Sequence, residues 1–115
     1  MNLERVTTLA AADGHNIPAY LLAPFSAQGG AVLIPPYGGT KEHMLGLAVA
    51  LGEAGIATLT IDLCGHGDNQ AAIGTAMRDE IESAIRFVRR FGPAAALGIS
   101  LGGRLALSLN EFPAI

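Results

Sequence analysis

One short segment of this sequence has the residue types and spacing of a catalytic nucleophile. Residues 98–103 read Gly-Ile-Ser-Leu-Gly-Gly, so Ser100 stands between Gly98 and Gly102. An uncharged run precedes this segment, and residues 101–110 can form a helix after it. A serine between glycines at a strand-to-helix junction is typical of a nucleophile elbow, because side chains at the glycine positions would collide in so tight a turn. The pattern predicts that Ser100 is a nucleophile.

A serine nucleophile works only with partners. It needs a base to take its proton and two N–H groups that bind the developing oxyanion. The N–H of Leu101, directly after the serine, is one donor by position. The chain has three histidines, His15, His43 and His66, and all of them precede Ser100. We expect His15 to lie exposed in a turn, far from the chemistry.

The elements that must position these residues alternate between strands and helices. Hydrophobic patterning predicts strands at residues 3–9, 17–23, 31–34, 57–61 and 94–99. Helices are predicted from a Thr40 cap to Ala54, from a Thr75 cap to the Arg89-Arg90 pair, and over 101–110. The first two strands form a hairpin around Asp13-Gly14. We therefore predict an α/β fold with a mostly parallel sheet of about five strands, crossover helices and an N-terminal antiparallel hairpin.

The composition limits which binding partners and which cellular compartment we expect for this protein. The 115 residues are expected to form one domain; 50% are hydrophobic and only 15% charged, so some surface should need covering. The net charge of −3, with no basic cluster beyond Arg89-Arg90, argues against nucleic acid. No membrane span, signal peptide, zinc site or cofactor is predicted. The single cysteine, Cys64, excludes an internal disulfide and favours a reducing, cytoplasmic location.

Three motifs, in order and spacing, resemble the α/β-hydrolase superfamily. Residues 35–40 (Pro-Pro-Tyr-Gly-Gly-Thr) stand where the family has its His-Gly-x-Gly-Gly oxyanion loop. Residues 62–67 (Asp-Leu-Cys-Gly-His-Gly) are similar to its Asp-x-Arg-Gly-His-Gly loop, and residues 98–103 to its elbow. The likeness is greatest to esterases, lipases and dienelactone-hydrolase-like members. It implies that residues 1–115 are a single domain, the N-terminal, nucleophile-bearing half of that fold.

The resemblance assigns roles to individual residues. Tyr37 supplies the second oxyanion N–H, because Pro36 has none. His66 and His43 are candidate bases, although the family histidine at the position of His66 usually holds its loop, and His43 sits in the first turn of a helix. Asp62 is expected to hold the loop of residues 65–67.

Two further residues of the same loop are expected to stay outside the chemistry. Cys64 has no neighbouring base in sequence, so it is a loop residue rather than a nucleophile. Asp68 is expected to be solvated.

The family's acid and histidine, which follow the nucleophile, have no counterpart here. The chain is thus expected to be a fragment, to be completed by a complementary C-terminal half, or to form a homodimer. The resemblance implies a serine hydrolase of the carboxylesterase type, acting on small-molecule esters with an incomplete triad. The alternative is a non-catalytic remnant that serves as a binding or assembly module.

Overall fold

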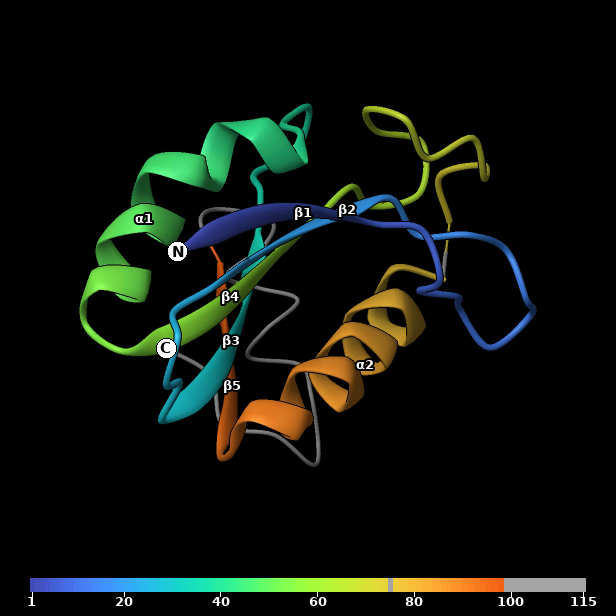
Figure 1. Cartoon of the computed structure of the whole chain (residues 1–115). Coiled ribbons are helices and arrows are strands. Elements are labelled where there is room, and N and C mark those ends of the chain that lie inside the picture. Colours follow the sequence, from blue (N-terminus) through green and yellow to red (C-terminus); the bar gives the residue numbers. More distant parts are fainter. Residues whose placement is uncertain (75, 99–115) are drawn as a thin grey trace.

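The computed structural model describes residues 1–74 and 76–98, and these contain one mixed sheet (Figure 1). Its strand order is β1-β2-β4-β3-β5. Strands β3, β4 and β5 run parallel, whereas β2 is antiparallel to both β1 and β4. The α/β architecture predicted from the sequence is confirmed. The strand bounds are β1 (Asn2–Val6), β2 (Ala19–Ala23), β3 (Gly29–Ile34), β4 (Ile56–Ile61) and β5 (Ala94–Gly98).

The predicted N-terminal hairpin is present, with shorter strands and a longer connection. Continuous pairing ends where Val6 faces Ala19. The Ile17 N–H still donates to the Leu9 carbonyl at 2.9 Å, but Pro18 has no N–H and interrupts the ladder. Gly14 turns the chain at a φ of +93°, a conformation that favours glycine.

Helices cover the two faces of the sheet (Figure 1). On one face lies α1 (Leu45–Glu53), preceded by the 3₁₀ turn η1 (Lys41–Met44). On the other lies α2 (Met77–Val88), followed by the 3₁₀ turn η2 (Arg89–Phe91). The first predicted helix therefore begins as a 3₁₀ turn. Ala76 takes the N-cap position of α2, whereas Thr75 and the predicted helix 101–110 lie outside the described residues.

The central strands alternate their side chains between two apolar clusters. Val32 and Ile34 pack against the α2 face, where the apolar stripe of the helix is buried as predicted. Leu33 points to the α1 face, beside Met44 and Ala48. Such double coverage explains why β3 is apolar at every position.

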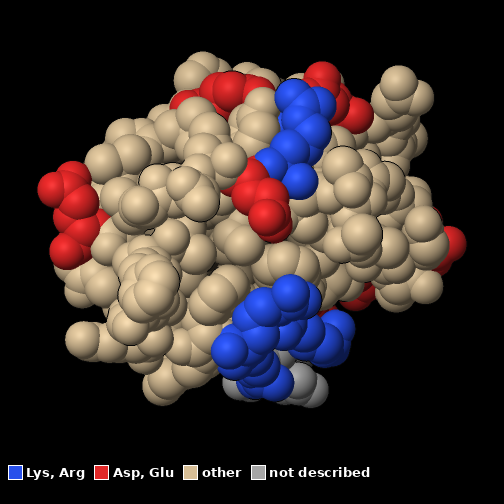
Figure 2. Space-filling model, in the orientation of Figure 1, with Lys and Arg blue, Asp and Glu red and all other residues tan. Residues whose placement is uncertain are grey.

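Strand β5 forms the end of the described sheet, next to β3. Of its five residues only Ala96 is buried, whereas all six residues of β3 are buried. The expected edge position of the fifth strand is confirmed for the described residues. On the face drawn in Figure 2, basic and acidic side chains form a few groups on a mostly uncharged surface. No helix of the described part is long and apolar enough to cross a membrane.

Candidate functional site

The segment predicted to be the oxyanion loop forms a tight turn at the carboxyl end of β3. The Gly39 N–H donates to the Pro36 carbonyl at 2.8 Å, and Gly38 has a φ of +80°. A positive φ at the third residue is the signature of a type II turn, with Tyr37 at its second position. Within the described part of the chain, no residue accepts a hydrogen bond from the Tyr37 backbone N–H. The Tyr37 N–H therefore remains a candidate oxyanion donor.

The sheet register places this turn beside the start of the predicted elbow. Ile34, the last residue of β3, is the Cα partner of Gly98, the last residue of β5. Neighbouring strands lie about 5 Å apart, and parallel strands release their loops at the same edge. The last residues of β3 and β5, Ile34 and Gly98, therefore lie side by side at the same edge of the sheet. The predicted Ser100, Leu101 and Gly102 themselves lie outside the described residues.

A buried ion pair that the sequence did not indicate lies directly after the turn. The Nζ atom of Lys41 is 2.8 Å from Oδ2 of Asp62, and the Lys41 backbone N–H donates to Oδ1 at 2.7 Å. Both residues are buried, with exposed fractions of 1% and 0%. Burial lowers the pKa of Lys41, but hydrogen bonds to Asp62 and Asp68 outweigh it and hold that pKa above its ordinary value. Lys41 is therefore a fixed positive charge.

Asp62 also organises the loop after β4, as predicted. Its Oδ2 accepts the Asp68 backbone N–H at 3.0 Å, and its own carbonyl accepts from the Asn69 side chain at 2.9 Å. Gly67 passes so close to the Asp62 carboxylate that a Cβ there would collide with it. Asp68, expected to be solvated, instead forms an ion pair with Lys41 at 2.8 Å, although two thirds of its side chain is exposed.

Solved structures similar to this chain are esterases and related hydrolases. An α/β-hydrolase from Penicillium matches with a TM-score of 0.82 and 18% identity, over 94% of this chain and 41% of its own. A thermostable carboxyl esterase from Bacillus coagulans matches with a TM-score of 0.75 and 20% identity, over 92% and 39%. A protein from Butyrivibrio proteoclasticus with bound ferulic acid matches with a TM-score of 0.73 and 25% identity, over 81% and 42%.

This chain has part of an α/β-hydrolase fold. It spans about two fifths of the length of these three structures. The sequence matches no protein-family description and no curated protein. The family resemblance inferred from the three motifs is thus supported by the architecture rather than by overall sequence similarity.

The two candidate bases near the edge of this α/β-hydrolase sheet, His66 and His43, differ in the hydrogen bond that their Nδ1 atom makes. In buried His66, Nδ1 lies 3.0 Å from the Cys64 carbonyl, which only accepts; Nδ1 carries the proton and Nε2 keeps its lone pair. The His66 ring meets the Tyr37 ring edge-on, with centroids 5.2 Å apart. In exposed His43, Nδ1 accepts the Thr40 backbone N–H at 2.9 Å, which uses the lone pair of the neutral ring. In the neutral tautomers that these contacts favour, and among the described residues, Nε2 of His66 has its lone pair unused, whereas the lone pair of His43 accepts from Thr40.

The expectation that His15 is exposed is wrong, because its side chain is only 21% exposed and contacts two carboxylates. Its Nε2 lies 2.7 Å from Oε2 of buried Glu80 on α2, and its Nδ1 contacts Asp13. Both partners are carboxylates, so both ring nitrogens carry protons. The hydrogen bond to Glu80, reinforced by Asp13, raises the pKa of His15 above its ordinary value against the opposing effect of burial.

Glu80 is the second buried charge that sequence reasoning missed. Its carboxylate accepts the Cys64 backbone N–H at 2.8 Å and the Asn69 side chain at 2.6 Å, besides His15. Its place four residues before Ala84 on the apolar stripe was the available signal. Cys64 is fully buried, and burial raises the pKa of its thiol, as fits the predicted non-nucleophilic role.

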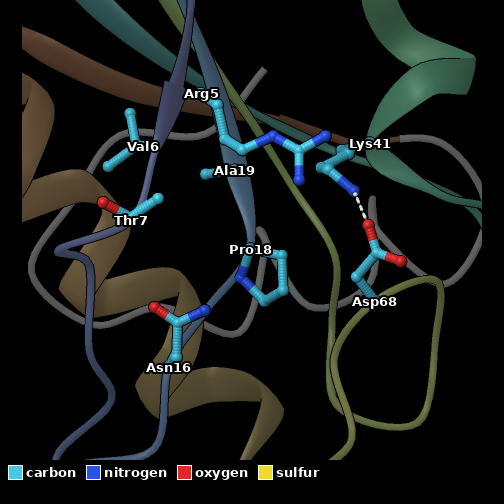
Figure 3. A pocket seen from close by; sticks show the side chains of 8 residues that line it. All are labelled: Arg5, Val6, Thr7, Asn16, Pro18, Ala19, Lys41 and Asp68. Atoms are coloured by element: carbon cyan, nitrogen blue, oxygen red, sulfur yellow. Dashed lines mark hydrogen bonds and ion pairs between the residues drawn. The ribbon is translucent and has the colours of Figure 1, made fainter.

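A cavity of about 230 Å³ opens beside Lys41, on the hairpin side of the sheet (Figure 3). It is separated from β5 by β4 and β3, so it does not adjoin the start of the predicted elbow. In Figure 3 Arg5 extends across it towards Lys41 and Asp68. Eight residues line the cavity: Arg5, Val6, Thr7, Asn16, Pro18, Ala19, Lys41 and Asp68.

Proposed function

We propose that this chain is a serine hydrolase acting on carboxylic esters, or the nucleophile-bearing part of one. The pairing of Ile34 with Gly98 is the observation that carries the proposal, because it sets the Tyr37 turn beside the segment leading to Ser100. The esterases among the structural neighbours agree with it. The protein would take a small-molecule ester; metal, cofactor and nucleic acid have no role in this scheme.

The proposed chemistry is acyl transfer through a covalent intermediate. Ser100 Oγ forms a bond to the ester carbonyl carbon and gives its proton to a base. The carbonyl oxygen becomes an oxyanion that accepts from the Tyr37 and Leu101 N–H groups. Collapse of this intermediate breaks the ester bond, and the alcohol leaves with the proton. Water then attacks the acyl-serine by the same route and regenerates Ser100.

The proposed chemistry requires a base that accepts the Ser100 proton. His15 has both nitrogens on carboxylates, and His43 has its lone pair on Thr40. His66 remains, in the loop that follows β4, and β4 is two places from β5 with β3 between them. We propose that full activity needs a histidine from a second copy of this chain or from a complementary C-terminal half. Without it, the oxyanion hole and binding leave only a residual rate.

The alternative function is a non-catalytic binding or assembly module. It is favoured by the contacts that occupy the ring nitrogens of His15 and the lone pair of His43, because these histidines cannot then act as the base. Pre-steady-state hydrolysis of a chromogenic acetate ester separates the two. The hydrolase proposal predicts a burst of product equal to the enzyme concentration, since acylation precedes slow deacylation, and no burst in Ser100→Ala. A wild-type trace that matches Ser100→Ala at every ester concentration would contradict the proposal and support the module.

A further inference from the structure

Residues 35–40 connect two fixed points, and only one of them belongs to the sheet. At the N-terminal side, Ile34 is fully buried in β3. At the C-terminal side, Lys41 is fixed by the two oxygens of Asp62, one through its backbone N–H and one through Nζ. Between these points the turn is closed by one hydrogen bond, from Gly39 to Pro36. Two contacts therefore tie this segment to β4 and the loop that follows it: the edge-on contact between the Tyr37 and His66 rings, and the contacts of Lys41 with Asp62.

Lys41 makes more contacts than a solvated helix-start lysine would. Its Nζ lies within 2.8 Å of both Asp62 and Asp68, and 3.3 Å from Glu42. It also lies 5.1 Å from the Tyr20 ring centroid on β2. The side chain thus joins the 35–40 segment to the loop after β4 and to the hairpin.

We propose that Lys41 is a positioning residue, which fixes the turn carrying the Tyr37 N–H by binding the Asp62 carboxylate across the sheet edge. The inference rests on the proposed function, because it takes that N–H to be an oxyanion donor. A buried pair costs desolvation of both ions and is weak evidence for stability by itself. The geometry supports a positional role, because the Asp62 carboxylate accepts from both the backbone N–H and the side chain of Lys41, the residue that directly follows the turn segment.

The test compares Lys41→Met with Arg5→Met as a matched control. Arg5 is a cation at the same sheet edge, with its guanidinium carbon 5.6 Å from the same Tyr20 ring, and its side chain donates to Tyr20 alone among the described residues. Two quantities are measured on the folded proteins: amide hydrogen exchange by mass spectrometry, and the rate at which a fluorophosphonate labels Ser100. The first reports the turn without any chemistry, and the second reports the oxyanion site.

We expect Lys41→Met to speed exchange in residues 35–40 but not in β2, and to slow labelling roughly tenfold, as small misplacements of catalytic groups do. Arg5→Met should leave both quantities unchanged. Unchanged exchange in Lys41→Met would overturn the inference. So would faster exchange with an unchanged labelling rate, because Lys41 would then hold structure without positioning Tyr37.

A second variant covers the case in which Lys41→Met does not fold because Asp62 is left unpaired. Lys41→Met combined with Asp62→Asn removes both charges and keeps an acceptor for the backbone N–H. It should show the same slow labelling, and labelling at the wild-type rate would overturn the inference. If the wild-type protein takes no label at all, the proposed function fails, whereas the exchange arm still decides whether Lys41 fixes the turn.

Discussion

At the residue scale, two buried charges that the sequence analysis missed, Lys41 and Glu80, are each bound by several partners. The burial of Lys41 could not be predicted from the sequence, because a lysine after a glycine turn is usually solvated. The burial of Glu80 had a signal, its position on the apolar stripe of α2, which the sequence analysis did not use. Their partners, Asp62 and Cys64, lie 21 and 16 residues away in sequence, so the contacts exist only once the sheet is built. By contrast, the role of Asp62 was predictable, since it ends a strand just before a glycine-rich loop.

The His15–Glu80 contact makes a prediction about pH. The pKa of His15 is raised in the folded protein, so its stabilising contribution is complete below about pH 6.5, the ordinary histidine value, and is lost as the pH rises through the folded pKa. Asp13 and Glu80 are the carboxylates that face the ring. His15→Gln should therefore lower the thermal midpoint most at mildly acidic pH and progressively less towards alkaline pH. His43→Gln is the control. A difference that is constant with pH, or that grows as the pH rises, would show that His15 is not charged in the folded state.

At the element scale, strands and helices were predictable because the pattern is consistent over whole segments. The α2 stripe recurs at helical spacing, and β3 and β4 carry no charged residue and are buried at nearly every position, as central parallel strands are. The ends of elements were less predictable. The first strand stops at Val6 rather than Leu9. The helix after Thr40 starts as a 3₁₀ turn, where the side chains of Lys41 and His43 make local contacts.

The packing of α2 on β3 depends on a glycine. A Cβ at Gly30 would lie 2.5 Å from the Val88 carbonyl oxygen, so the helix would have to move. We expect Gly30→Ala to lower the free energy of unfolding by about 1–3 kcal/mol, as overpacking does. In the control, Gly46→Ala on α1, a Cβ meets nothing within 4 Å; there the stability should stay equal or rise by up to about 1 kcal/mol. Urea unfolding measures both. Equal changes in the two variants would contradict this view of the α2 interface.

At the scale of the whole molecule, the described sheet ends at β5, and the structural neighbours are about twice as long as this chain or more. An unpaired strand edge favours pairing with another chain. The homodimer and the complementary half predicted from the sequence both follow from this edge, and both remain predictions. The catalytic base, which the proposed chemistry still lacks, could arrive with either.

We expect the isolated chain to associate at micromolar concentration through β5. Ala95→Lys on that strand should weaken association, because a charged side chain on an edge strand opposes pairing. Ala50→Lys, on the exposed side of α1, should not. Light scattering across a concentration series measures the mass. A wild-type chain that stays monomeric and melts cooperatively would rule out the predicted association.

The most direct test of the account is whether Ser100 is an activated nucleophile. The wild-type chain is incubated with a fluorophosphonate, and the modified residue is located by mass spectrometry of its peptides, with Ser100→Ala and heat-unfolded protein as controls. The account predicts one adduct, on Ser100, formed slowly by the folded protein and absent from both controls, because only the folded protein directs the Tyr37 and Leu101 N–H groups at the negative charge that develops on the phosphoryl oxygen. No adduct under any condition, or an adduct that persists in Ser100→Ala, would contradict it.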